Sequence, residues 1–372
     1  MNSAHVDSFA RQEERLHVLD GMRGWGAIFV LFFHVFCEGL PVTAESGAYL
    51  RRLLPFSGLY AVLVFFVVSG ISLSYGYFRE RNVEKLIAAA GSRYFRLAIP
   101  IFVVAVAVHL AMIAGLHSLS KERIAPFSNA LSFQSTIENV LRFSFFDVFF
   151  NYNPGLTYAG PMWTMSVELI GSFLLFAVLL LSCRSAYYLA IISAVSFILM
   201  FSVTQVFKFY SLFLFGAMIA GLIHRGYAKD ISPWLFAGML AIGISAPAYL
   251  PPAYDAWNML ATVALTLGCI GIKPVNSFLS CQFSKLLGII SFPLYLVHGP
   301  ILVLIGEPLV HNFGGTAQSK FAIDVGICVI SVLVALPMIP VNRLAIQISR
   351  FFGRQAVYSY NRVRIQLAPS QN

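Results

Sequence analysis

The composition of this 372-residue chain is that of a membrane protein, since 58% of its residues are hydrophobic, only 11% are charged and the mean hydropathy is +0.78. Soluble domains carry about 25% charged residues, so a soluble globular domain is excluded. The net charge of +9 does not indicate nucleic-acid binding, because the chain offers no soluble basic domain to hold a nucleic acid.

Apolar segments predict an all-α, polytopic bundle of about ten membrane-spanning helices, each of which requires roughly 20 apolar residues. In chain order the expected spans are 18–39, 56–78, 96–116, 160–182, 186–204, 206–224, 231–250, 256–272, 285–306 and 321–345. The first fifteen residues are polar and have no apolar core, so no cleavable signal peptide is expected. The expected organisation is an N-terminal segment, 1–17, an integral membrane domain, 18–345, and a basic tail, 346–372.

Lysine and arginine lie mainly on one side of these spans. With both termini in the cytoplasm, 18 of these residues lie on the cytoplasmic side and 7 on the outer side. A bias of that size predicts the orientation. It makes 79–95 a basic cytoplasmic loop and 117–159 the longest outer segment, which is rich in Phe and Tyr and is expected to form an interfacial helix and a lid.

The first span carries a polar pair, Arg23 and His34. Eleven steps at ~100° per residue make three turns plus about 20°, so both side chains face the same way and are offset by about 16 Å along the axis. A polar stripe of this length in an apolar segment is costly, and it is therefore a functional-site hypothesis.

Three ionisable side chains from three predicted spans lie at one depth. His34, Glu168 and His298 each lie about 8–12 Å below the outer end of their span at ~1.5 Å per residue. Arg23 and Arg96 lie near the cytoplasmic face. Taken alone, each histidine has an ordinary explanation as a packing residue and each arginine as a topology anchor. Residues that only pack have no reason to meet in one layer, so the convergence favours function.

Motifs for other chemistries are absent from the sequence. It contains no GxSxG elbow, no HExxH, no P-loop and no GxGxxG. The five cysteines form no CxxC and no metal-ligand spacing, so neither a metal nor a permanently bound cofactor is expected. His109 lies at the same depth as His34 but in no motif, and we interpret it as a packing residue. Among the chemistries considered, acid–base catalysis by His and Glu side chains is the one that the sequence still supports.

Five motifs resemble those of the membrane-bound acyltransferase-3 family. They are an LDGxRG start with a cation ten residues before a histidine (19–24 and His34), FFVxSG (65–70), RxxR (93–96), a WSLSVE-type motif (163–168) and an SYxLYLxH-type motif (291–298). They follow the family's order over about 280 residues, and the resemblance covers essentially the whole chain. The departures are Leu63, where many members are acidic, Ile71 and Leu169. No fused esterase-like domain is present, so a stand-alone member is expected.

The resemblance implies transfer of an acyl group, usually acetyl, from cytoplasmic acyl-CoA to a hydroxyl of an extracytoplasmic glycan. The acceptor would be a polysaccharide, lipopolysaccharide or oligosaccharide, and the location the inner membrane of a bacterium. His34 would be the general base, because an imidazole suits proton transfer near neutral pH, and Glu168 would fix its tautomer or stabilise the imidazolium. The implied groups are catalytic His34, Glu168 and Arg23, donor-binding Arg93, Arg96 and Ser69, and acceptor-binding Trp163, Tyr295 and His298.

Two other functions stay open at this point. A non-catalytic transporter could use His34, Glu168 and His298 as a proton relay, although the sequence shows no inverted repeat and no paired broken helices. An inactive family member could serve as a membrane partner. Within the enzyme hypothesis, direct transfer in a ternary complex is expected, and a transient acyl-His34 is the variant. The sequence does not predict the oligomeric state.

Overall fold

The computed structural model describes residues 3–366 except 117–130, 183–184, 186 and 227–230. Every regular element in this part of the chain is helical, which confirms the predicted all-α fold. The helices are α1 (Ser3–Phe32), α2 (Ala44–Leu50), α3 (Gly58–Glu80), α4 (Val83–Ile113), α5 (Ile137–Arg142), α6 (Val148–Phe150), α7 (Trp163–Ser182), α8 (Tyr188–Met200), α9 (Gln205–His224), α10 (Pro233–Tyr249), α11 (Ala256–Gly271), α12 (Lys273–Leu279), α13 (Gln282–Ile301), α14 (Glu307–Phe313), α15 (Ala317–Ala335) and α16 (Met338–Gln366).

Among the described residues, seven helical segments are long and apolar enough to cross a membrane, or eight if α11 and α12, which meet at 90°, form one bent span. The chain is thus a multi-pass membrane protein, with fewer full-length spans than the expected ten. The difference lies mainly in α8 and α10, which are apolar but only 13 and 17 residues long. A helix needs roughly 20 residues to cross the bilayer core, and a shorter helix crosses it only where the bilayer is thinner.

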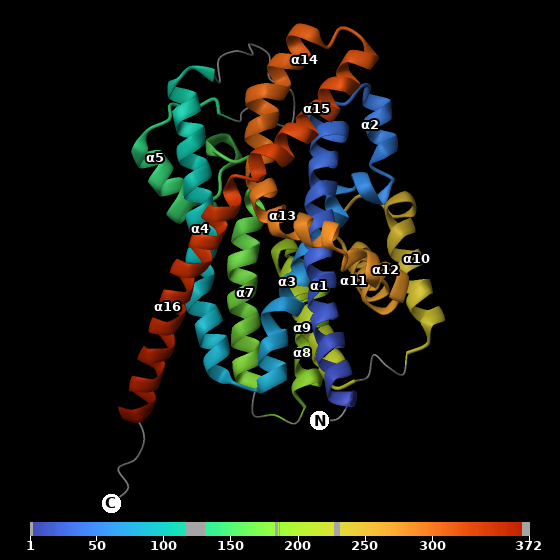
Figure 1. Ribbon diagram of the computed structural model, residues 1–372, viewed down its shortest axis with the longest axis vertical. Coiled ribbons are helices and arrows are strands. Elements are labelled where there is room, and N and C mark those ends of the chain that lie inside the picture. Colours follow the sequence, from blue (N-terminus) through green and yellow to red (C-terminus); the bar gives the residue numbers. More distant parts are fainter. Residues whose placement is uncertain (1–2, 117–130, 183–184, 186, 227–230, 367–372) are drawn as a thin grey trace, which may run out of the picture.

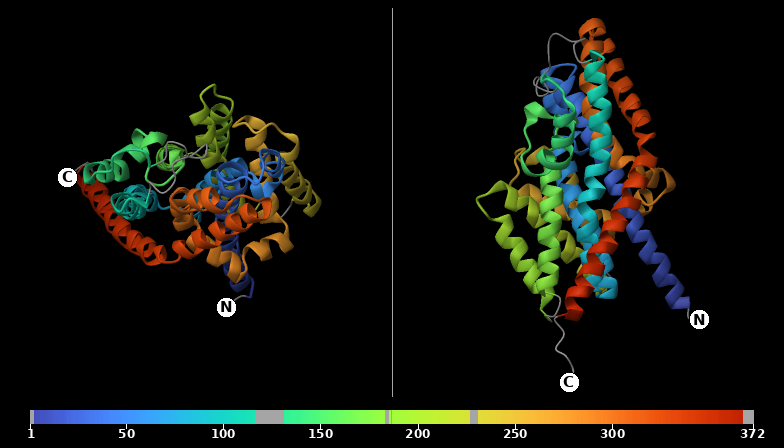
Figure 2. Two further views of the ribbon diagram at one scale, coloured as in Figure 1. Left: turned by 90° about the horizontal axis from the view of Figure 1, so that it is seen from above. Right: turned by 90° about the vertical axis from the view of Figure 1, so that its left-hand side faces the viewer.

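Helices α1 and α3 form the centre of the bundle (Figures 1 and 2). Helix α1 packs against α13, and α3 packs against α9 and α11. Seen from above, α16 forms an arc on one side of the bundle and α10 lies on the opposite side. The start of α1 and the end of α16 lie at the same end of the molecule (Figure 1), which is the arrangement that an orientation with both chain ends on one side requires.

Glycines in two of the motifs allow the central helices to touch. A Cβ added to Gly24 of α1 would lie 2.6 Å from the backbone nitrogen of Gly288 on α13. A Cβ added to Gly70 of α3 would lie 2.1 Å from the carbonyl oxygen of Phe213 on α9. In a membrane, where helix association depends on close packing, small residues at such crossings stabilise the bundle. These motif glycines therefore have a packing role.

We expect Gly70→Ala to destabilise the folded protein by about 1–3 kcal/mol, because the added methyl group overpacks the α3–α9 crossing. Gly76→Ala, on the same helix, is the matched control, since a Cβ added there would have nothing within 4 Å. That control should be neutral or slightly stabilising, because alanine favours a helix more than glycine does. Denaturant unfolding of the two purified variants in detergent measures both effects, and equal midpoints would contradict the close-crossing interpretation.

One predicted boundary, that of the cytoplasmic loop, is wrong. The expected cytoplasmic loop 79–95 is helical from Val83, because Asn82 caps the first turn by accepting a hydrogen bond from the backbone N–H of Glu84. Its charged residues lower the hydropathy without breaking the helix, so the third span begins inside a 31-residue helix. Of the expected outer segment 117–159, residues 117–130 lie outside the described part, and 131–159 contain α5, α6 and two short turns.

The C-terminal part also differs from the prediction. The expected last span, 321–345, is interrupted after Ala335, and α16 starts at Met338. The expected tail continues this helix to Gln366 and packs along α4 instead of forming a mere cytoplasmic extension. A hydropathy window cannot separate α15 from the apolar first turns of α16, and it treats the arginines further along as tail.

Candidate functional site

Two cavities follow one another along the axis of the bundle. The larger, the outer cavity, has a volume of about 850 Å³ and contains His34 and Glu38 on its wall. The smaller, the inner cavity, has a volume of about 230 Å³. Six of the predicted site residues line it: Arg23, Ser69, Arg93, Arg96, Glu168 and Tyr295. Val62, Thr164 and Tyr295 line both cavities. The two spaces therefore adjoin at these three side chains.

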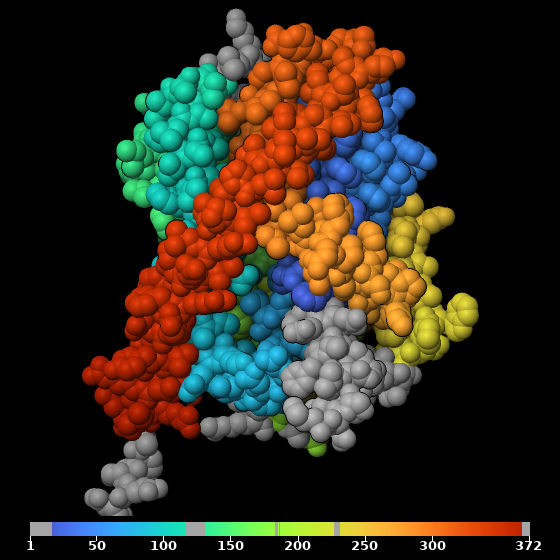
Figure 3. Space-filling view, in the orientation of Figure 1, coloured from blue at the N-terminus to red at the C-terminus, as the bar shows by residue number. Residues whose placement is uncertain are grey.

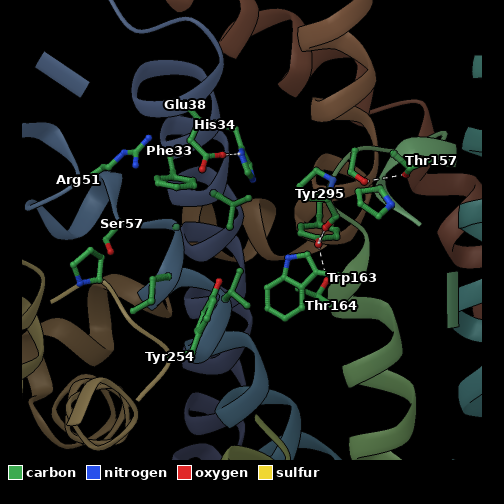
Figure 4. Close-up of a pocket in the computed structure, with 18 of the residues that line it drawn as sticks. Phe33, His34, Glu38, Arg51, Ser57, Thr157, Trp163, Thr164, Tyr254 and Tyr295 are labelled. Carbon is green, nitrogen blue, oxygen red and sulfur yellow. Dashed lines mark hydrogen bonds and ion pairs between the residues drawn. The ribbon is translucent and has the colours of Figure 1, made fainter. Parts of the chain in front are cut away.

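The histidine of the outer cavity has a carboxylate partner from its own helix. His34 and Glu38 lie in the π-helical turn η1 (Phe33–Gly39), which continues α1. The Nδ1 atom of His34 lies 2.8 Å from Oε2 of Glu38 (Figure 4). A carboxylate at Nδ1 fixes the imidazole tautomer and orientation and stabilises the imidazolium form. This pair has the geometry of an oriented general base.

Glu38 is a site residue that the sequence motifs do not identify. It lies at the outer end of the first expected span, where a charged residue is usually the start of a loop. The available signal is its spacing of four residues from His34, which places two side chains on one face of a helix. Arg51 reaches the same wall, where its guanidinium donates to the carbonyl oxygen of Cys37 at 2.7 Å and lies 5.4 Å from the ring centre of Phe33.

His298 supports His34 from behind. The two imidazole rings are stacked with their centres 5.3 Å apart, and the Nδ1 atom of His298 lies 3.1 Å from the carbonyl oxygen of Leu294. His298 is only 2% exposed and lines neither cavity, and its Nε2 atom has no hydrogen-bond partner among the described residues. The fold thus places His298 beside His34 but behind the cavity wall, and its acceptor-binding role stays a prediction.

Aromatic side chains form the floor of the outer cavity. Trp163 packs against Tyr254, with ring centres 5.8 Å apart (Figure 4). Both rings also pack against Phe209. Burial and, to a lesser extent, the negative charge of Glu38 raise the pKa of Tyr254 to about 12. Tyr254 therefore keeps its hydroxyl proton at neutral pH and can donate a hydrogen bond. Flat aromatic faces with a few polar groups suit the C–H faces and hydroxyls of a sugar.

The boundary between the cavities is a hydrogen-bonded pair. The hydroxyl oxygens of Thr164 and Tyr295 lie 2.6 Å apart, and the Tyr295 hydroxyl donates to the carbonyl oxygen of Pro161 at 2.7 Å. Thr164 comes from α7 and Tyr295 from α13, so the pair joins the WSLSVE-type motif to the SYxLYLxH-type motif. The pair therefore lies where the two cavities adjoin.

The inner cavity is lined by arginines with partial charge compensation. Arg93 forms an ion pair with Glu168 and donates through Nε to the hydroxyl of Ser172 at 3.0 Å. Ser69 donates to the two carboxylate oxygens of Glu168 at 3.0 and 3.2 Å. Both members of the ion pair are at most 9% exposed. Ser69, Arg93 and Glu168, from three motifs, thus form one buried cluster.

Two further arginines, Arg23 and Arg96, complete this wall. Arg23 bonds the hydroxyl of Ser72 and pairs with Asp20 at 3.1 Å. Arg96 lines the same cavity, and the positive charges of Arg93 and Arg23 act on it. Arg23 and His34 therefore line successive cavities from one helix, as their common face predicts.

Glu168 does not share a cavity with His34, although the depth estimate places both in one layer. The estimate takes Gly160 as the outer end of the span. Helix α7 instead begins well below the outer ends of α4 and α14 (Figure 1), and Pro154–Leu156 and the following turn precede it. Glu168 consequently lies with the arginines. His109, whose Nδ1 lies 2.6 Å from the hydroxyl of Ser135, lines neither of these cavities.

Comparison with known proteins gives one match. The family model described as an acyltransferase domain (Acyl_transf_3) matches residues 16–339. Searches of the curated proteins and of the solved structures gave no match. The matched range contains every residue that lines the outer cavity and every residue of the inner cavity except Asn342.

Proposed function

The chain belongs to the membrane acyltransferase-3 family, and on this premise we propose that it transfers an acyl group from cytoplasmic acyl-CoA to a hydroxyl of an extracytoplasmic glycan. The observation that carries the proposal is the adjacency of the two cavities, one lined by arginines and one containing a histidine–carboxylate pair. An acyl-CoA thioester needs cations for its phosphates, and an acceptor hydroxyl needs a base. The bundle offers these groups in that order along one path.

The inner cavity suits the slender part of the donor. Ligand pockets usually enclose about 300–1,000 Å³, so about 230 Å³ is too small for a whole coenzyme A and fits its pantetheine arm. Arginine side chains bind phosphate through charge-assisted, bidentate hydrogen bonds. Acetyl is the acyl group that we propose, because an inner cavity of about 230 Å³ leaves little room for a longer acyl chain beside the pantetheine arm. The bacterial inner membrane is the proposed location, with the arginine-lined end facing the cytoplasm.

The proposed reaction takes place where the cavities meet. Nε2 of His34 accepts the proton of the acceptor hydroxyl as its oxygen attacks the thioester carbonyl carbon. The tetrahedral intermediate collapses, the carbon–sulfur bond breaks, and the imidazolium returns its proton to the leaving thiolate of coenzyme A. Glu38 stabilises the imidazolium, the role that the sequence suggests for Glu168. Glu168 instead holds Arg93 in place.

The outer cavity suits a glycan acceptor. Its volume of about 850 Å³ accommodates one or two sugar rings, and Trp163 and Tyr254 offer aromatic faces for them. A polysaccharide, lipopolysaccharide or oligosaccharide is the proposed acceptor class. The transporter alternative is less well supported, because a proton relay through His34, Glu168 and His298 requires direct links, whereas Glu168 bonds Arg93 and Ser69.

The test supplies acetyl-CoA labelled in the acetyl group to membranes with and without the protein, and measures alkali-labile label on extracytoplasmic glycan. Label that depends on the protein supports the proposal, and its absence with a range of surface glycans contradicts it. Initial rates at varied donor and acceptor concentrations distinguish the two chemical routes. Intersecting lines are expected for direct transfer, and parallel lines would indicate an acyl-His34 intermediate.

Arg96→Ala should raise KM for acetyl-CoA by about tenfold and leave KM for the acceptor unchanged, because Arg96 lines only the inner cavity. A lost charge-assisted hydrogen bond of about 1.4 kcal/mol corresponds to that factor. Arg51→Ala is the matched control, since Arg51 lines only the outer cavity. Steady-state kinetics on both variants check the assignment, and a selective acceptor defect in Arg96→Ala would refute it.

A further inference from the structure

A third cavity lies between α4 and α16, outside the path described so far. It encloses about 550 Å³ and is lined by three residues of α4 and four of α16: Ala88, Ala89, Ser92, Gln347, Arg350, Gly353 and Arg354. Two arginines and no carboxylate are present among these residues. The cavity is therefore a cationic recess, and the residues on α16 lie beyond the matched family range, which ends at 339.

The recess and the inner cavity are both lined by residues of α4 and α16. Asn342, also on α16, lines the inner cavity, and the positive charge of Arg350 acts on Arg96 together with those of Arg93 and Arg23. Along α16, Arg350 and Arg354 follow Asn342 by about 12 and 18 Å at ~1.5 Å per residue. That span is comparable with an extended pantetheine arm. A ligand whose thin end enters the inner cavity would therefore place its other end against these two arginines.

The position of α16 is fixed by close contacts with α4. The rings of Phe95 and Phe352 are stacked with their centres 3.6 Å apart, and a Cβ on Gly353 would lie 2.6 Å from the carbonyl oxygen of Ala88. Asn361 donates to Glu84 at 3.0 Å. Figure 3 shows α16 as a diagonal band across the surface of the bundle. The recess is thus a fixed feature of the fold, and it is open on the side that faces away from the bundle.

The charges in and beside the recess repel one another. Arg350 and Arg354 are four residues apart on one helix face, both are exposed, and like charges at this spacing are unfavourable. Close by, Arg96 experiences three positive charges, and Asp20 is the carboxylate that acts against them. A bound anion with more than one negative charge would relieve this repulsion, so a phosphate ligand suits the recess.

We propose that Arg350 and Arg354 bind phosphate groups at the nucleotide end of the acyl-CoA donor while its pantetheine arm enters the inner cavity. The inference rests on the proposed function, because it takes acyl-CoA as the donor. It adds α16 to the donor site and assigns two residues outside the family's matched range. A phosphate could also come from a lipid headgroup, and the experiment below separates the two sources.

The test compares Arg350→Gln/Arg354→Gln with Arg362→Gln/Arg364→Gln, a charge-matched control on the same helix whose residues line none of the three cavities. Each purified protein is placed in nanodiscs of neutral phosphatidylcholine, and calorimetry measures binding of coenzyme A, dephospho-coenzyme A and pantetheine. We expect Kd for coenzyme A to rise at least tenfold in the first variant only. Pantetheine binding should be the same in all three proteins, since it lacks the phosphates.

Each other result overturns the inference in a recognisable way. Unchanged coenzyme A binding in Arg350→Gln/Arg354→Gln, with normal binding by the parent protein, refutes the α16 site and leaves the proposed function intact. No coenzyme A binding by the parent protein refutes both. A third result would be that the two variants have the same Kd for coenzyme A but differ in melting temperature, and only in nanodiscs that contain anionic phosphatidylglycerol. The recess would then bind lipid headgroups instead. Both variants change exposed positions, and the melting temperature checks that each is folded.

Discussion

His34→Ala is expected to lower kcat for acyl transfer at least about 10³-fold with little change in KM for acetyl-CoA, because it removes the proposed general base and leaves the arginine-lined inner cavity intact. Glu38→Gln should lower kcat by about 10²-fold, since the imidazole keeps a hydrogen-bond partner at Nδ1 but loses the charge that stabilises the imidazolium. The graded order distinguishes a base from a mere packing residue. Transfer of labelled acetyl to glycan, at matched expression, measures both.

His109→Ala is the matched control for this series. His109 is also a buried histidine with a close polar partner, Ser135, but it lines neither the outer nor the inner cavity. The kcat of the His109→Ala variant should equal that of the parent protein. Full activity in His34→Ala would move the base elsewhere. Equal losses in His34→Ala and His109→Ala would mean that the assay responds to the stability of the bundle and not to chemistry.

The sequence predicts the fold class because the spans need only apolar length, which is a local property. It does not predict how far each helix extends in depth. Helix α7 begins at Trp163 in the interior, and this depends on the segment that precedes it, which no hydropathy window contains. For this reason the depth estimate places Glu168 level with His34, whereas the structure places it with the arginines of the inner cavity. For the same reason the sequence presents α16 as a tail, since its role depends on packing against α4.

Pairings of distant side chains are the other limit of the sequence. The motifs give residues that belong to the site, and the structure places Arg23, Ser69, Arg93 and Glu168 around one cavity. Which carboxylate faces which cation depends on helix rotation, which the motifs do not encode. Glu38 is the opposite case, because its partner His34 is on the same helix and the i, i+4 spacing is enough to identify it.

The structure also explains why one motif contains both a polar residue of the site and a glycine that is needed for helix packing. The FFVxSG motif supplies Ser69 to the buried cluster and, one residue later, Gly70 to the α3–α9 crossing. The close crossing fixes the height and rotation of α3, and this places the hydroxyl of Ser69 within reach of Glu168. Packing and chemistry are thus coupled at neighbouring positions, so a variant at Gly70 is expected to lower donor affinity as well as stability.

Glu168→Ala is expected to destabilise the protein by about 3–5 kcal/mol, because it leaves the guanidinium of Arg93 buried without its ion-pair partner. Arg93→Met should cost less, since a carboxylate left alone can take up a proton and keep its bond to Ser69, whereas a guanidinium cannot lose one. Glu80→Ala is the control for an exposed ion pair, with Lys85, and should lower the stability far less than Glu168→Ala does.

The double variant Arg93→Met/Glu168→Leu separates stability from binding. Removing both charges should restore most of the free energy of unfolding, because apolar side chains can replace a buried ion pair at little cost. Affinity for coenzyme A should stay low, since an arginine of the proposed donor site is gone. Denaturant unfolding and calorimetric binding on the same preparations give both values. If the double variant recovers affinity along with stability, the pair serves only to hold α4 against α7, and the donor site lies with Arg23 and Arg96.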